Sequence, residues 1–402
     1  MTRTGSSALT AVALVAAVWG LLHVGWYPHG QIVDTPVYES YANDIVHQHK
    51  LPYRDFTVEY PPAALPVFAA PELIAKRHFR SVFELLMATC HALAVFAVAL
   101  LAGRRAAVLA AIAPLALGSV VLTRFDFWPA ALAVLGLAAL LRRRLVVSAL
   151  LLGTGFAAKL WPALLAPFIL VWLVRNRGAR SATAWAAVSV AAAAAWFLPF
   201  TVFSPAGVGH SFHAQFARPL QLESLGGAVL IALHRVAGTR LHVVSTFGSQ
   251  NLAGPGAHAA AIVTTATGAL AVVALWFAFA RGDAARDRLF AASAGAVAAT
   301  VAFGKVFSPQ FLIWLIPLVP LVRWMLPIAL FGAALVCTQL YFPKHYWALT
   351  QFSPTQSWEV FARDLLVVVL AGALARLVLQ HEVLGEARAR RETIERVRAQ
   401  VE

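Results

Sequence analysis

Five acidic residues close to the first apolar run are the strongest candidates for chemistry in this chain. They are Asp34, Glu39, Asp44, Asp55 and Glu59, and they make up five of its 18 acidic residues. Carboxylates beside long apolar segments are costly to keep unless they are paired or take part in chemistry. A carboxylate in such a place can accept a proton from a hydroxyl group, so we expect a general base in this segment.

The composition indicates which elements must position these residues. The chain has 402 residues, of which 60% are hydrophobic and 12% charged, whereas a soluble domain carries about 25% charged residues. Its apolar runs are continuous rather than alternating, which predicts an all-α polytopic membrane protein and not a membrane β-barrel. The net charge of +14 comes from basic clusters between these runs, a pattern typical of membrane topology, and no nucleic-acid partner is expected. Cys90 and Cys337 both lie in apolar runs, so no disulfide framework is expected.

The basic clusters orient the predicted helices, because short loops rich in Lys and Arg stay in the cytoplasm. They predict about 12 helices with both termini cytoplasmic, the first being a retained signal anchor. The segments 145–158 and 161–174 are short for full spans and are expected to form a broken or re-entrant pair. Residues 60–80, interrupted by prolines, are expected to form a half-inserted element. The predicted helices cover residues 8–27, 81–102, 106–122, 128–141, 145–158, 161–174, 181–200, 258–280, 289–304, 310–323, 325–342 and 360–379.

This topology divides the chain into a membrane domain, residues 1–380, and a charged cytoplasmic tail, residues 381–402. Two long outer loops are expected, at 28–80 and 201–257. The outer side gathers charges of both signs, whereas the inner side carries the arginine clusters. We therefore expect a water-filled cavity with chemistry in it on the extracytoplasmic side, formed by residues that include Asp34, Asp55, Glu59, Arg124, Asp126, Lys159, Arg218, Glu223, Lys305 and Lys344.

An acidic residue, Asp34, follows the first helix, and five short motifs come after it along the chain. They are Pro52-Tyr53-Arg54-Asp55, Glu59-Tyr60-Pro61-Pro62, Arg124-Phe125-Asp126-Phe127-Trp128-Pro129, Lys159-Leu160-Trp161-Pro162, and the run from Lys305 through Ser308-Pro309-Gln310 to Pro317. In this order they resemble the motifs of glycosyltransferase family 87, whose members have the GT-C fold. The resemblance runs from Asp34 to about Pro317 and is closest to the polyprenol-phosphate-mannose-dependent α-mannosyltransferases of actinobacterial envelope glycolipid synthesis. It implies a GT-C-like bundle whose extracytoplasmic loops form the active site, with no metal and no cofactor.

The resemblance places the catalytic base on the first outer loop, directly after the first helix, which selects Asp34. Such an enzyme moves a glycosyl group from a polyprenyl phosphate to a hydroxyl group, and the base accepts the hydroxyl proton. Asp34 is also a suitable N-cap for a helix over 36–49, with Pro36 in its first turn. The two roles are compatible.

A phosphate leaving group requires cations on the same face of the protein. We expect phosphate contacts from Lys305, Lys159, Arg124 and His345. Lys159 has an alternative partner in Asp126, and Arg124 alternatively pairs with the first outer loop.

Other polar residues of the outer loops are expected to bind the sugar or the acceptor. Glu59 is placed to orient sugar hydroxyls, whereas Asp55 alternatively forms an ion pair with Arg54. The segment that begins at Arg218 either binds the acceptor or caps a packed helix. The full set of expected substrate contacts is Asp55, Glu59, Tyr60, Asp126, Arg218, Gln221, Glu223 and Gln310.

The expected donor is a polyprenyl-phosphate-linked sugar, because nucleotide sugars are absent outside the cytoplasm and the chain has no large soluble domain to bind one. The resemblance favours mannose, with arabinofuranose as the alternative. The expected acceptor is an envelope glycolipid or polysaccharide, such as a phosphatidylinositol mannoside or a lipoglycan, reached in the plasma membrane among its lipids. A transporter, a lipid flippase and a non-catalytic assembly subunit are the other classes considered. A transporter should show an internal repeat and mid-bilayer charges, and the sequence shows neither.

Overall fold

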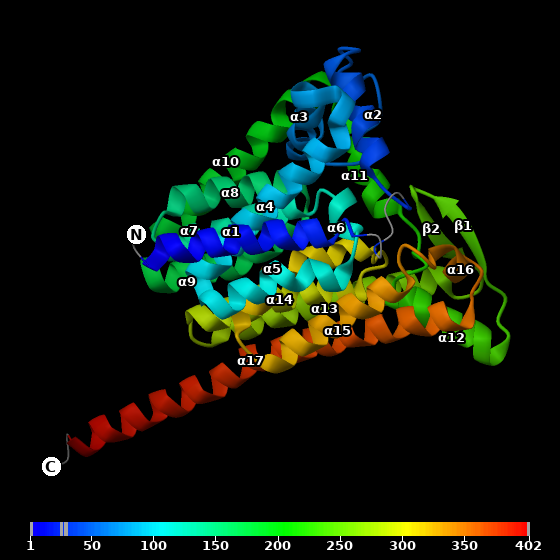
Figure 1. Ribbon diagram of the computed structural model, residues 1–402. Helices are drawn as coiled ribbons and strands as arrows, with labels where there is room; N and C mark the ends of the chain where they lie inside the picture. Colours follow the sequence, from blue (N-terminus) through cyan, green and yellow to red (C-terminus); the bar gives the residue numbers. More distant parts are fainter. Residues whose placement is uncertain (1–2, 25–26, 28–30, 400–402) are drawn as a thin grey trace.

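A computed structural model describes residues 3–24, 27 and 31–399, without the side chains of residues 3–9, 11 and 381–399. Most helices lie side by side in a bundle, α2 and α3 project from one side, and the long α17 runs along the opposite side (Figure 1). A β-hairpin lies at one end of the bundle. The α-helices are α1 (Arg3–Leu21), α2 (Thr35–Val46), α3 (Leu65–Ala75), α4 (Phe79–Ala102), α5 (Arg104–Leu117), α6 (Val120–Thr123), α7 (Phe127–Leu141), α8 (Leu145–Ala158), α9 (Ala166–Arg177), α10 (Ala179–Phe203), α11 (Pro205–Ala217), α12 (Leu225–Ala237), α13 (Ala257–Arg281), α14 (Arg286–Phe303), α15 (Met325–Tyr341), α16 (Tyr346–Thr350) and α17 (Pro354–Ala399).

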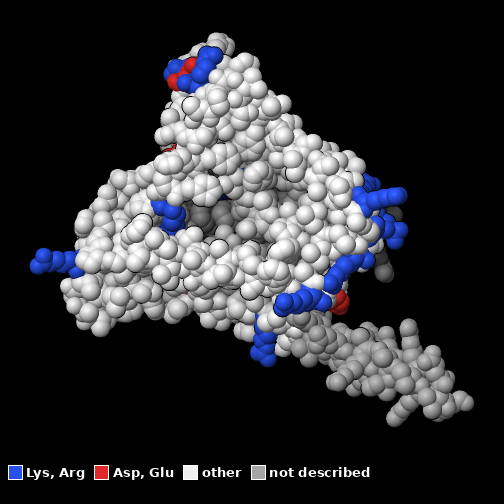
Figure 2. All heavy atoms as spheres, turned by 180° about the vertical axis from the view of Figure 1, so that it is seen from behind, with Lys and Arg blue, Asp and Glu red and all other residues white. Residues whose placement is uncertain are grey.

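Three helical segments among the described residues are long and apolar enough to cross a membrane. They are Pro62–Ala102, Ala179–Phe203 and Ala257–Arg281. Several other apolar helices, including α7, α8 and α15, are shorter. The predicted total of about 12 spans is therefore not confirmed. Figure 2 shows a broad surface with few charged side chains. Most basic side chains on this face gather towards one end, and others lie at the projecting tip and towards the opposite end. A wide surface poor in charge is expected of a protein surrounded by lipid.

Glycine residues allow the helices to reverse direction at the basic end of the bundle. Gly103 joins α4 to α5 with φ +84°, and Gly178 joins α9 to α10 with φ +85°. A residue with a Cβ is strained in this region of the backbone map, whereas glycine is not. Each glycine thus ends one helix and starts its antiparallel neighbour.

Helix α14 forms the centre of the bundle, and most of its residues are buried. Its sequence is rich in alanine and contains Gly295, so neighbouring helices approach closely. The Cβ that Gly295 lacks would lie 3.0 Å from Leu275 on α13 and 3.4 Å from Leu374 on α17. Substitution with a larger residue would force these helices apart.

Two sequence-based expectations differ from the structure. The predicted helix 310–323 consists of two 3-10 segments, Pro309–Leu315 and Val319–Val322, since the prolines in this stretch remove backbone donors. The fold is not purely α-helical, because β1 (His242–Thr246) and β2 (Ser249–Ala253) pair antiparallel within the outer loop 201–257.

Two other expectations stay predictions. Helix α17 continues without a break past residue 380, and the division into a membrane domain and a cytoplasmic tail is not tested by this. Residues 60–80, predicted as a half-inserted element, contain α3, which ends at an abrupt backbone turn before α4.

Helix α11 is held against the first outer loop by an unusually close contact. A Cβ on Gly207 would lie 1.8 Å from the backbone oxygen of Tyr53, and the Ser204 hydroxyl donates to that same oxygen at 3.0 Å. Tyr53 itself has φ +67°. Two segments that are about 150 residues apart in sequence are therefore fixed side by side, and both contribute to the cavity described next.

Candidate active site

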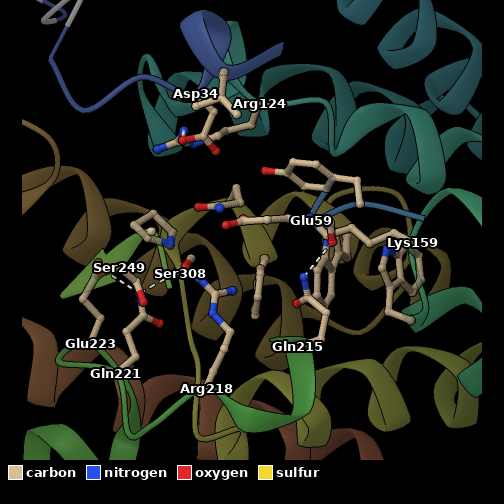
Figure 3. Close-up of a pocket in the computed structure, with 18 of the residues that line it drawn as sticks. Asp34, Glu59, Arg124, Lys159, Gln215, Arg218, Gln221, Glu223, Ser249 and Ser308 are labelled. Atoms are coloured by element: carbon tan, nitrogen blue, oxygen red, sulfur yellow. Dashed lines mark hydrogen bonds and ion pairs between the residues drawn. The ribbon is translucent and has the colours of Figure 1, made fainter. Parts of the chain in front are cut away.

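A cavity of about 330 Å³ lies where the first outer loop, α11, the β-hairpin and the segment after α14 meet (Figure 3). Figure 3 shows Asp34 and Arg124 on one side of it and Arg218 on the opposite side. Its charged and amide-bearing lining residues are Asp34, Glu59, Arg124, Lys159, Gln215, Arg218, Gln221, Glu223 and Gln310. Most of these are residues that the sequence singled out, so the outer loops do converge.

Asp34 is held by an arginine rather than by its own helix. It is the N-cap residue of α2, but its side chain makes no capping hydrogen bond. Instead its Oδ1 forms an ion pair with Arg124, whose side chain is only 5% exposed, whereas that of Asp34 is 28% exposed. The Tyr38 hydroxyl approaches Oδ2 at 3.4 Å, which is too long for a strong bond. The buried Arg124 thus orients the carboxylate of Asp34, which remains accessible from the cavity.

The backbone before Asp34 is strained in a way that supports this arrangement. Ile32 has φ +51°, which is a genuine outlier for a β-branched residue. Its carbonyl oxygen accepts a hydrogen bond from Nη2 of Arg124 at 2.9 Å. Strained residues of this kind concentrate at functional sites.

Lys159 lies in a cage of aromatic rings at the cavity wall. Its Nζ is 4.8 Å from the ring centre of Phe125, 5.3 Å from that of Trp314 and 5.5 Å from that of Phe311. Nζ donates to Oδ1 of the buried Asp126 at 2.6 Å, and the Trp314 indole donates to the same oxygen at 2.6 Å. The carboxylate and the ring faces both attract the positive charge of Lys159 and hold it in place.

Glu59 and Arg218 carry opposite charges into the same cavity. Partial enclosure raises the pKa of the Glu59 carboxyl above its usual value, an effect that Arg218 opposes and Asp34 reinforces. The backbone oxygen of Glu59 accepts from Gln215 at 2.8 Å, and Nη2 of Arg218 donates to the backbone oxygen of Phe247 at 2.8 Å. Glu59 is therefore a carboxylate with increased proton affinity beside the oriented Asp34.

Gln221 ties the loop before α12 to the segment after α14. Its Nε2 donates to Glu223 and to Ser308, both at 3.1 Å, and its Oε1 accepts from the Phe307 backbone at 2.7 Å. Glu223 also accepts from the Tyr341 hydroxyl at 2.9 Å. Burial raises the pKa of Glu223 to about 7, against the opposing effect of Arg363.

Four polar atoms of cavity-lining side chains are buried with neither a hydrogen-bond nor an ion-pair partner among the described residues. They are Nε of Arg124, Nε of Arg218, Nε1 of Trp161 and Oε1 of Gln310. Buried polar groups are almost always paired, so each such atom calls for an explanation. A polar ligand in the cavity would supply the missing partners.

A second hollow, of about 830 Å³, adjoins the first. Arg218 lines both. Lys305 lines only the second, where its Nζ donates to the backbone oxygen of Phe216 at 2.6 Å and burial lowers its pKa. The rest of the lining is mainly apolar and follows α13 from Ala257 to Ala269. This hollow therefore combines basic groups with an apolar groove along a helix of membrane-spanning length.

Four of the expected site residues do not line the first cavity. Asp55 is exposed and forms the ion pair with Arg54 at 2.8 Å that was its alternative. Asp126 lies behind Lys159, Lys305 lines the neighbouring hollow, and His345 precedes α16 outside both cavities. Residues that line the cavity but were not among the expected contacts include Gln215, Ser249, Ser308, Phe311, Trp314 and Tyr346.

Some of these additional residues could have been predicted from the sequence. Ser308 and Trp314 belong to the motif that begins at Lys305, whereas nothing in the sequence indicates Gln215 or Ser249. Among the described residues, no three His, Cys, Asp or Glu side chains converge as a metal site would require.

Comparisons with known proteins agree with this description. The sequence model of glycosyltransferase family 87 matches residues 56–309. Among solved structures, the chain is similar to ArnT from Cupriavidus metallidurans bound to undecaprenyl phosphate, with a TM-score of 0.50 and 16% identity over 96% of this chain and 79% of that one. It is also similar to the apo form of the Archaeoglobus fulgidus oligosaccharyltransferase, with a TM-score of 0.42 and 14% identity over 94% and 56% of the two chains. A search of curated protein sequences finds no match. The likeness to ArnT shows a common fold.

Proposed function

The chain belongs to glycosyltransferase family 87, as its motifs predicted, and we propose that it transfers a sugar from a polyprenyl-phosphate donor to an acceptor hydroxyl bound in the cavity around Asp34. The observation that carries this proposal is that carboxylates and cations line one cavity: Asp34 and Glu59 supply the carboxylates, and Lys159 and Arg218 supply positive charge. A transfer of this kind needs both a base for the hydroxyl and positive charge for the departing phosphate.

Asp34 is the proposed general base. It takes the proton of the acceptor hydroxyl as the acceptor oxygen bonds to the anomeric carbon. The bond from that carbon to the phosphate oxygen breaks, and its electron pair leaves with the polyprenyl phosphate. Arg124 fixes the orientation of Asp34, as a third group orients the base in other enzymes. Glu59, which also lines the cavity, is proposed to hold sugar hydroxyls.

The departing phosphate is proposed to lie between Lys159 and Arg218. Lys159 is fixed by Asp126 and three rings, so it is preorganised and needs no reordering during the reaction. Arg218 has a buried Nε without a partner among the described residues and can therefore donate to a phosphate oxygen.

The lipid part of the donor is proposed to leave the cavity past Arg218 into the groove along α13. This groove is apolar along its length and basic where it meets the cavity, at Arg218 and Lys305. Such a distribution fits a phosphate joined to a long hydrocarbon chain. The undecaprenyl phosphate bound to ArnT is a ligand of this chemical type.

The proposal extends to the substrates and the location. Mannose is the proposed sugar, with arabinofuranose as the alternative, and the proposed acceptor is an envelope glycolipid or lipoglycan such as a phosphatidylinositol mannoside. The protein is proposed to lie in the plasma membrane with both termini cytoplasmic and the cavity outside. Residues 1–380 form the proposed catalytic domain, and residues 381–402 the cytoplasmic tail.

The test offers the purified protein three radiolabelled donors with an acceptor lipid extract: polyprenyl-phosphate-mannose, polyprenyl-phosphate-arabinose and GDP-mannose. We expect transfer from the mannose lipid. Transfer from the arabinose lipid alone would keep the proposed donor class and change the sugar. Turnover of GDP-mannose alone would contradict the proposed donor, and no transfer from any donor would favour a transporter.

A further inference from the structure

A crevice at the opposite end of the bundle gathers positive charge without a matching carboxylate. It has a volume of about 130 Å³ and is lined by Arg105 and Arg323 together with apolar residues of α4, α5 and α15. Within the described part of the chain, no acidic residue lines it and neither arginine forms an ion pair. Arg105 donates to the sulfur of Met325 at 3.2 Å, which is a weak acceptor.

The crevice is separated from the candidate active site by the length of two helices. It lies at the start of α5, whose other end leads through α6 to Arg124, and that helix of 14 residues is roughly 21 Å long. It also lies at the start of α15, whose other end leads to Phe342 at the active-site cavity, and that helix of 17 residues is roughly 25 Å long. A ligand in the crevice therefore cannot be the substrate of that cavity.

The N-terminal ends of α5 and α15 add to the positive electrostatic potential of the two guanidinium groups. The first turns of α5 and α15 both line the crevice, through Arg105 and Ala106 on α5 and Met325 and Ile328 on α15. Neither helix has a side-chain cap or an acidic residue in its first turn. Unpaired N–H groups and the positive end of the helix dipole both favour an anion. Two such ends and two guanidinium groups converge on one crevice.

The surroundings of the crevice point to an amphiphilic anion rather than a free one. Next to Arg323, the side chains of Trp324, Met325 and Leu326 are 55%, 57% and 58% exposed. Exposed apolar side chains beside a basic pocket are typical of the membrane interface, where they contact acyl chains. Basic pockets between helices at the ends of membrane spans bind anionic lipid headgroups.

We propose that this crevice binds the phosphodiester headgroup of an anionic phospholipid, held by Arg105, Arg323 and the N-terminal turns of α5 and α15. The volume is roughly ten times the 10–15 Å³ that a single water requires, which leaves room for a phosphate group. The acyl chains lie against Trp324 and Leu326. The bound lipid joins the start of α5 to the start of α15.

The test uses the full-length protein in vesicles of equal phosphatidylglycerol and phosphatidylcholine, followed by native mass spectrometry of retained lipid. The wild type should retain phosphatidylglycerol in preference. The double variant Arg105→Gln/Arg323→Gln should retain about 30-fold less phosphatidylglycerol. This is the loss of affinity expected when two basic side chains are removed at a membrane surface. Both side chains are exposed, so the fold should persist. The control Arg142→Gln/Arg177→Gln removes the same charge from exposed positions outside the crevice and should behave as wild type.

A second measurement does not depend on the variants. Photoactivatable phosphatidylglycerol should crosslink the wild type at the first turns of α5 and α15. Equal loss of lipid in both double variants, or crosslinks elsewhere only, would overturn the proposal in favour of diffuse charge attraction. Displacement of phosphatidylglycerol by millimolar inorganic phosphate would overturn it in favour of a soluble phosphate ligand.

Discussion

Substitutions at Lys159 can separate its proposed catalytic role from its role in stability. In the wild type its ammonium neutralises Asp126, whose side chain is 1% exposed and which lies 2.6 Å away. The variant Lys159→Met keeps the apolar stem but leaves a buried carboxylate without its cation. Breaking a buried pair in this way costs about 3–5 kcal/mol, which lowers the thermal midpoint of a chain of this length by roughly 5 °C.

A second substitution removes that structural cost and leaves the catalytic one. In Asp126→Asn/Lys159→Met the buried group is neutral, and the new amide oxygen can still accept from the Trp314 indole, as the carboxylate does at 2.6 Å. The expected residual cost is about 1–2 kcal/mol. If Lys159 stabilises the departing phosphate, both variants should nevertheless lose transfer activity by about 10²–10³-fold.

The assay measures the thermal midpoint in detergent and single-turnover sugar transfer for the wild type and both variants. The double variant should recover most of the lost stability but little of the lost activity. Recovery of both together would refute the reasoning, because Lys159 would then act only as the partner of Asp126.

Other parts of the site give three further expectations. Lys305→Ala should raise the KM for the donor lipid by roughly 10- to 100-fold through loss of a charged contact. Lys76→Ala, which removes an exposed ammonium paired with the buried Glu72 of α3, should leave this KM unchanged. Equal effects of the two variants in donor-binding measurements would argue against the groove. Burial raises the pKa of Glu223 from 4.5 to about 7, so the folded state holds its proton more tightly than the unfolded state does. Its contribution to wild-type stability, up to about 3 kcal/mol, should be lost as the pH rises from 4.5 to 7. Glu223→Gln should make the fall of stability with pH shallower in thermal scans, and curves parallel to the wild type would contradict this. In a background without Cys90 and Cys337, a membrane-impermeant maleimide applied from outside should label Glu59→Cys but not Arg143→Cys, and the reverse pattern would invert the proposed topology.

The sequence was sufficient to identify most of the charged residues of the cavity. Asp34, Lys159 and Arg218 lie far apart along the chain, but each follows or precedes an apolar run on the same side of the predicted topology. Alternation of apolar runs and basic clusters determines that side, so their convergence did not depend on knowing any contact. The same reasoning predicted the pair of Lys159 with Asp126 as an alternative, and that pair is present.

Other features depend on tertiary contacts that no local pattern contains. Gln215 reaches the cavity because α11 packs against Tyr53 through Gly207, and a lone glycine in an apolar segment does not reveal this partner. Lys305 lies outside the cavity because its backbone is held against Gln221. The backbone N–H of Gln221 donates to the backbone oxygen of Lys305 at 2.8 Å. The β-hairpin arises in a segment between apolar runs where hydropathy gives no signal. Hydropathy likewise does not distinguish the proline-rich 3-10 segments from a regular helix.

The proposed role of Asp34, accepting the acceptor proton during transfer from a lipid-linked donor, is tested most directly by one comparison. Single-turnover transfer from polyprenyl-phosphate-mannose is measured for the wild type, Asp34→Asn and Asp55→Asn, with donor binding measured in parallel. Asp55 belongs to the same outer loop but pairs with Arg54 away from the cavity, so Asp55→Asn is the matched control. We expect Asp34→Asn to lose about 10²–10⁴-fold in rate with donor binding retained, while Asp55→Asn stays close to wild type. The thermal midpoint of Asp34→Asn should fall by only a few degrees, through loss of the ion pair with the buried Arg124. Wild-type turnover by folded Asp34→Asn would contradict this role.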